Sequence, residues 1–148
     1  MSTRTPLAVG LVGALVAAGA LAPAALGATK PKPKPITRTY EATATPDPTS
    51  TNPVTNEICA PTTPTAKHVY AFTVPAKGVL SVTLGNQLDW SVAIRDSYGD
   101  TLATADGGTP TDKETTASSF KRKEKITIET CNFAGEPTIP VSFTFTYK

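Results

Sequence analysis

Apolar and polar residues alternate along most of the chain from His68 onward. Successive side chains of a β-strand point to opposite faces, so this period of two is typical of strands with one buried and one solvated face. Turn-forming residues interrupt the alternation about every 8 to 12 residues, as in an antiparallel sandwich or jelly roll. After residue 27, no segment has the apolar spacing of an amphipathic helix. The sequence therefore predicts an all-β fold, an antiparallel β-sandwich or jelly roll.

The alternation also assigns side chains to the two faces of each predicted strand. The predicted strands are 68–74, 80–84, 88–95, 101–105, 118–121, 126–131 and 141–147. The large core side chains are expected on the apolar faces of these strands: Tyr70, Phe72, Trp90, Phe143 and Phe145. The third strand is expected to expose its other face to solvent, with Asp89, Ser91, Ala93 and Arg95.

Residues 1–27 have the pattern of a cleaved secretory signal. Arg4 precedes the apolar run 7–22, and small residues follow it. Cleavage between Ala24 and Ala28 fits the small-residue rule for signal peptidase sites. A membrane anchor is the alternative, but the run is shorter than the roughly 18 to 20 residues that a spanning helix needs. We therefore expect a secreted protein with no membrane span after cleavage.

Residues 28–35 follow as a linker, which contains the sequence KPKPKP at positions 30–35. Proline at every second position fixes φ and removes backbone donors, so we expect an extended spacer. The three lysines are either solvated in a plain spacer, which is the simpler interpretation, or they touch an anionic wall polymer. The remaining residues, 36–148, are expected to form one domain.

Cys59 and Cys131 are the only cysteines of the chain. Two cysteines of an exported protein pair by default, because the compartment is oxidising. Cys59 lies in a stretch rich in Pro and Thr, 46–65, that is typical of a loop, and Cys131 ends a predicted strand. A disulfide between them is therefore predicted to fasten this loop to the sheet, and it stabilises the fold by about 4 kcal/mol in the chain-entropy model.

The sequence contains no recognisable catalytic motif. His68 is the only histidine, which excludes a metal site built on several histidines, and no Gly-x-Ser-x-Gly turn is present. Four of the 14 basic residues precede Ile36, so the predicted domain has 10 basic and 12 acidic residues. This balance gives no reason to expect a nucleic-acid partner. We expect a protein that is not an enzyme.

Calcium is the one cofactor that the sequence leaves open. Hard oxygen ligands on loops suit this ion, and aspartates gather in the middle of the predicted domain. The candidate ligands are Asp89, Asp96, Asp100 and Asp106, with Asp112 nearby. The ligand spacing of an EF-hand is absent, and aspartates at turns more often serve turn geometry and solubility. No other cofactor is expected.

The segment Tyr70–Leu84 reads YAFTVPAKGVLSVTL. It resembles the bacterial pre-peptidase C-terminal domain, in which an aromatic strand, a Pro-Ala-x-Gly turn and a Leu-x-Val-x-Leu strand recur. In that family the next strand opens with Asp, as Asp89 does here, and the domain ends on an alternating strand, as 141–147 does. The resemblance covers about the last 80 residues. It implies a jelly-roll module of secreted proteins with an accessory or binding role and no catalysis of its own.

These observations lead to one principal hypothesis about function and two alternatives. The principal hypothesis is a secreted, non-catalytic binding or accessory module. Its partner would be a cell-wall polymer, a polysaccharide or another secreted protein. One alternative is a secreted protease inhibitor that presents the segment Cys59–Pro64 as a rigid loop. The other is a purely structural surface protein.

Overall fold

The computed structural model describes residues 30–47, 58–85, 89–106 and 115–148. The described part of the chain contains eight strands and one short turn of 3-10 helix. These elements are β1 (Ile36–Thr43), η1 (Pro64–Ala66), β2 (Lys67–Thr73), β3 (Gly78–Leu84), β4 (Asp89–Arg95), β5 (Thr101–Asp106), β6 (Thr115–Phe120), β7 (Lys125–Ala134) and β8 (Thr138–Tyr147). Residues 32–148 make up one compact unit.

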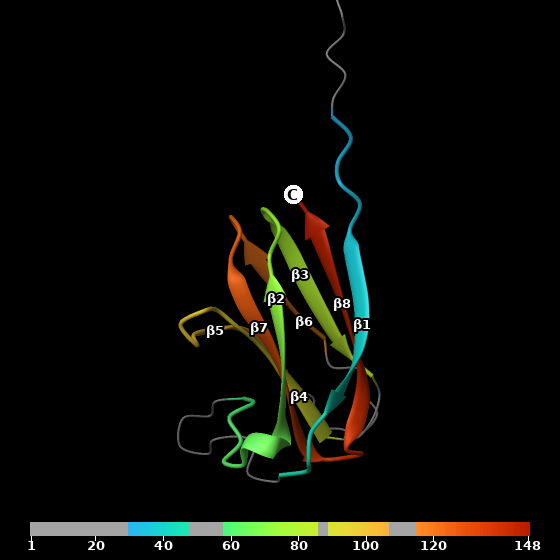
Figure 1. The fold of residues 1–148 in the computed structure, drawn as a ribbon, viewed down its shortest axis with the longest axis vertical. Helices are drawn as coiled ribbons and strands as arrows, with labels where there is room; N and C mark the ends of the chain where they lie inside the picture. Colours follow the sequence, from blue (N-terminus) through green and yellow to red (C-terminus); the bar gives the residue numbers. More distant parts are fainter. Residues whose placement is uncertain (1–29, 48–57, 86–88, 107–114) are drawn as a thin grey trace, which may run out of the picture. The chain divides into compact units, whose positions relative to one another are not determined.

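The eight strands form two four-stranded antiparallel sheets (Figure 1). One sheet has the order β1-β8-β3-β6, and the other has the order β2-β7-β4-β5. Strands early in the chain thus pair with strands late in the chain, in the nested order of a jelly roll. The prediction of an all-β sandwich or jelly roll is confirmed.

Strand β1 is absent from the strands that the sequence predicts. Its residues alternate, but Arg38 stands in the row that faces the core and interrupts the apolar pattern. The strand nevertheless pairs with β8 along its whole length, from Ile36 opposite Phe145 to Thr43 opposite Thr138. Because β1 is an edge strand, the Arg38 side chain reaches solvent without entering the core.

The core lies between the two sheets and contains the aromatic residues that the alternation assigned to it. Trp90, Phe143 and Phe145 are fully buried. Tyr70 and Phe72 are partly buried and pack on Phe143, with ring centroids 5.4 and 5.1 Å from its ring. These tilted and edge-on contacts are the geometry that aromatic pairs prefer. The prediction of the core residues is therefore confirmed.

The prediction that β4 has one solvated face is wrong. Ser91, Ala93 and Arg95 are buried, although they lie on the face that points away from the core. The segment around Cys59 packs on this outer face, where Cys59, Ala93 and Cys131 form a second buried cluster beside Ile58. The alternation along a single strand carries no information about a distant loop that covers it.

The remaining expectations for the N-terminal part concern residues that are mostly outside the described ranges. The predicted signal peptide, 1–27, and the start of the linker fall there. Within the described ranges, no helix is both long and apolar enough to cross a membrane.

Truncation of the central aromatic contact tests this account of the core. Phe143→Ala removes a fully buried ring that contacts Tyr40, Tyr70 and Phe72. We expect the free energy of unfolding to fall by about 3 to 5 kcal/mol, measured by urea denaturation. The control is Thr39→Ala on the outer face, which we expect to change it by about 0.5 kcal/mol or less. Equal losses in the two variants would contradict this assignment of the core.

Candidate binding site

The disulfide fastens the covering segment to the sheet. Cys59 is bonded to Cys131 on β7, across a sequence separation of 72 residues, as predicted. Cys59 has a φ of 60°, a left-handed conformation that costs about 1 kcal/mol or more for a residue with a side chain. The outer face of β4 and β7 is therefore closed to a ligand where Ile58 and Cys59 lie over it.

A buried charge cluster joins the covering segment to three strands. The Arg95 Nε atom on β4 lies 3.0 Å from Glu129 Oε2 on β7, and Lys67 Nζ on β2 lies 3.2 Å from the same oxygen. The Arg95 guanidinium also donates to the carbonyl oxygens of Ile58 and Gly99, at 3.3 Å each. Several partners thus compensate for the desolvation of this arginine, and its role is structural.

Asp47 fixes the exposed end of the covering segment. Its buried carboxylate accepts a hydrogen bond from the backbone N–H of Thr63 at 3.2 Å and one from the Thr62 hydroxyl at 3.4 Å. Its backbone N–H donates to the carbonyl oxygen of Asn132 on β7 at 2.9 Å. The segment Cys59–Pro64 is therefore tied to the sheet at both ends, and Thr62, Thr63 and Pro64 remain exposed.

The four candidate calcium ligands are divided between the two ends of the β4–β5 hairpin. Asp89 and Asp106 lie at one end, where burial and the Asp89 charge raise the pKa of Asp106. Asp96 and Asp100 lie at the other end, in the turn. In the described ranges, no three His, Cys, Asp or Glu side chains are grouped as a metal site would require. Asp112 lies outside those ranges.

The turn between β4 and β5 presents an aromatic ring to solvent. The Asp96 carboxylate accepts the backbone N–H groups of Tyr98 and Asp100, at 2.8 and 2.9 Å, and Gly99 has a φ of 89° that glycine adopts readily. These bonds fix the turn and leave Tyr98 89% exposed. An exposed tyrosine on a well-defined turn is a typical contact residue of a binding surface.

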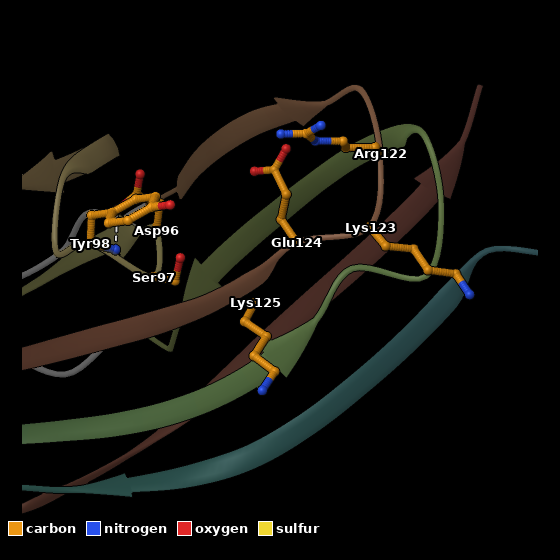
Figure 2. Close-up of a pocket in the computed structure, with 7 residues that line it drawn as sticks. All are labelled: Asp96, Ser97, Tyr98, Arg122, Lys123, Glu124 and Lys125. Atoms are coloured by element: carbon orange, nitrogen blue, oxygen red, sulfur yellow. Dashed lines mark hydrogen bonds between the residues drawn. The ribbon is translucent and has the colours of Figure 1, made fainter.

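A polar hollow of about 620 Å³ separates this turn from the turn between β6 and β7. Figure 2 shows Tyr98 on one side of the hollow and the Arg122 and Lys123 turn on the other. The residues that line the hollow are Asp96, Ser97, Tyr98, Arg122, Lys123, Glu124 and Lys125. The hollow is therefore bounded by an aromatic ring, by the basic residues Arg122, Lys123 and Lys125, and by the two acids Asp96 and Glu124.

More basic residues lie at the same end of the sandwich, which we call the basic end. It is defined by Lys77, Lys121, Arg122, Lys123, Lys125 and Lys148, all of which are exposed. Hydrogen bonds place them together, because Val74 N–H donates to the Glu124 carbonyl oxygen at 2.8 Å and Lys148 N–H donates to the Lys77 carbonyl oxygen at 3.1 Å. The β2–β3 turn, the β6–β7 turn and the C-terminus are neighbours in Figure 1. Six basic residues outnumber the acids Asp96 and Glu124 at this end, and such an excess of positive charge creates a potential that attracts anions.

The sequence reasoning did not identify the basic end. The sequence feature that could have indicated it is the run Lys121–Lys125, in which four of five residues are basic. The near-neutral balance of the whole domain concealed this run, because acidic residues elsewhere compensate for it. Comparisons with models of known protein families and with curated proteins find no match to the chain.

The buried charge cluster leads to a prediction about stability. Glu129→Leu removes the carboxylate that accepts from Arg95 and Lys67. Because it leaves cationic groups partly buried without this counterion, we expect the free energy of unfolding to fall by about 3 kcal/mol in urea denaturation. Glu136→Leu, which replaces an exposed acid, is the control. If the free energy of unfolding falls equally in Glu129→Leu and Glu136→Leu, the cluster does not stabilise the fold.

The raised pKa of Asp106 leads to a prediction about pH. Burial and the Asp89 charge both disfavour the ionised form in the folded state. The folded state therefore binds its proton at a higher pH than the unfolded state does, and Asp106→Asn should stabilise the protein slightly at neutral pH. This advantage should shrink as the pH falls from the raised pKa of Asp106 in the folded state to the ordinary pKa of aspartate, below which both states are protonated. The measurement is the difference in melting temperature from the wild type across this pH range. A difference that does not change with pH would contradict the prediction.

Proposed function

We propose that the protein is a secreted, non-catalytic module that binds an anionic polysaccharide of the cell envelope at the basic end. The observation that carries the proposal is the exposed Tyr98 ring beside the Lys121–Lys125 run. A lysine- and arginine-rich surface attracts carboxylate or phosphate groups along a polymer. The tyrosine ring offers an apolar face and a hydroxyl group to the sugar rings between those groups.

Export is supported by the signal-like pattern of residues 1–27 together with the disulfide. Disulfides form and persist in oxidising compartments, and they are rare in the cytosol. The bond between Cys59 and Cys131 is thus consistent with a protein that leaves the cytoplasm.

The surroundings of the single histidine favour a non-catalytic role. His68 Nδ1 accepts a hydrogen bond from the backbone N–H of Thr43 at 3.3 Å, and its ring stacks on Tyr40 with centroids 5.6 Å apart. A general base needs a free nitrogen within hydrogen-bond reach of the proton that it removes. Here one nitrogen is engaged with the backbone and the ring is part of an aromatic stack.

The resemblance to the pre-peptidase C-terminal domain agrees with this role. The motif Tyr70–Leu84 spans β2, the following turn and β3, which fits its pattern of two strands joined by a turn. The jelly-roll order is compatible with such a module. A fold alone does not specify a function, so the proposal depends on the surface of the basic end.

The inhibitor hypothesis has less support than polymer binding. Ile58 and Cys59 pack against the sheet, and Pro64–Ala66 form a turn of 3-10 helix. Only a short stretch between them is exposed, and the Asp47 carboxylate holds it in a bend. This leaves little extended backbone for a protease to bind.

Charge reversal at the basic end tests the proposal. We expect Arg122→Glu combined with Lys123→Glu to weaken retention of the mature protein on immobilised polygalacturonate about tenfold or more at low salt. The matched control is Lys32→Glu with Lys34→Glu in the linker, which makes the same change in charge. Tyr98→Ala should weaken retention without changing its salt dependence, because it removes no charge.

Two results would contradict the proposal. The first is no retention of the wild-type protein on polygalacturonate. The second is an equal loss in the linker variant and the domain variant, which would assign the binding to the KPKPKP segment. Methyl-esterified polygalacturonate has the same sugar backbone without charge, and under the same conditions it should retain the wild-type protein no better than Arg122→Glu/Lys123→Glu.

A further inference from the structure

The outer face of the β1-β8-β3-β6 sheet carries hydroxyl groups in rows. Thr144 on β8 lies between Thr37 on β1 and Ser81 on β3. In the next row, Ser142 lies between Thr39 and Thr83. We call these six residues the hydroxyl face. Neighbouring strands are about 4.8 Å apart, and outward residues along one strand are about 7 Å apart, so the hydroxyl face is a regular grid.

Hydrogen bonds between β1 and β8 join four of the six side chains of this grid in pairs. The hydroxyl oxygens of Thr37 and Thr144 are 3.1 Å apart, and those of Thr39 and Ser142 are also 3.1 Å apart. Each hydroxyl has one donor and two acceptor sites, so one such bond leaves capacity for an external partner. Because these four side chains are already held in pairs, a ligand would order few additional torsions there on binding.

The hydroxyl face contains no charged residue. Two charged residues on β1 lie near it. Arg38 lies between Thr37 and Thr39, but it belongs to the row that faces the core and reaches solvent at the edge of the sheet. Glu41 faces outward one row beyond Thr39, opposite Pro140. In this domain many of the exposed cations lie at the basic end, away from this face. An uncharged face can meet an uncharged partner without the large penalty of desolvating ions.

We propose that the hydroxyl face binds the ordered surface of an uncharged polysaccharide. Sugar chains present hydroxyl groups that donate and accept, together with C–H groups, and threonine presents a hydroxyl and a methyl group in the same way. The residues of the grid come from three adjacent strands of one sheet, so the partner is an extended surface. This surface is separate from the basic end and does not depend on the function proposed for it.

Co-sedimentation with insoluble, uncharged polysaccharides tests the proposal. The probes are microcrystalline cellulose, chitin and a β-1,3-glucan, in 1 M salt, where the Debye length is about 3 Å and binding through the basic end is suppressed. We expect the wild-type protein to sediment with at least one probe. Thr144→Lys places a charge in the centre of the hydroxyl face, and we expect it to weaken that binding about tenfold or more.

The matched control is Thr73→Lys, which makes the same change at an exposed position on the outer face of the other sheet. Thr144→Val removes one hydroxyl but adds no charge, so it should weaken binding less than Thr144→Lys. Melting temperatures show whether each variant is folded. The proposal is overturned if no probe retains the wild-type protein, or if Thr73→Lys and Thr144→Lys have the same effect. Loss of binding in Arg122→Glu/Lys123→Glu under these conditions would also overturn it.

Discussion

The arrangement of the surface depends on the covalent attachment of the segment around Cys59 to β7. A sandwich of two sheets has two outer faces, and the disulfide closes part of one of them. Beneath this cover, the guanidinium of Arg95 binds Glu129 and the Ile58 carbonyl oxygen, so a charged cluster is buried outside the main core. The other sheet has no such cover in the described ranges. The two outer faces therefore differ in chemistry. On the β2-β7-β4-β5 sheet, the segment around Cys59 covers the ion pair of Arg95 and Glu129. The β1-β8-β3-β6 sheet instead exposes a grid of neutral hydroxyl groups.

Much of the fold can be predicted from local sequence, since a strand that buries one face repeats every two residues. Trp90, Phe143 and Phe145 were assigned to the core in this way, and the structure places them there. The same rule fails in β1, where Arg38 occupies the inward row. An edge strand tolerates this residue because its side chain reaches solvent, and no local pattern distinguishes an edge strand from a central one. The rule also fails on the outer face of β4, which is buried by a loop 30 residues or more away in the chain.

The candidate site was less predictable, because it combines residues from several turns. Pairing of Cys59 with Cys131 could be predicted, since a chain with two cysteines has one intramolecular pairing. The aspartates were grouped by their proximity in sequence, whereas the hairpin separates Asp89 and Asp106 from Asp96 and Asp100. The approach of Tyr98 to the Lys121–Lys125 run depends on the order of strands in the sheet, in which β4 pairs with β7. That order is a long-range property, and the alternation does not contain it.

The two proposed surfaces follow from one physical feature, the uneven distribution of charge over the domain. Exposed cations at turns cost little desolvation, and at the ends of strands they do not disturb the pairing of the sheet. Cations in the middle of the β1-β8-β3-β6 sheet would instead lie directly opposite one another on neighbouring strands and repel. Threonine and serine suit those positions, because branched or small side chains fit the pleat and bond across strands, as Thr37 does to Thr144. Because charged and neutral residues are separated in this way, the basic end can attract an anionic polymer while the hydroxyl face contacts a neutral surface. Salt distinguishes the two interactions, because it screens the attraction between charges and leaves the neutral contact unchanged.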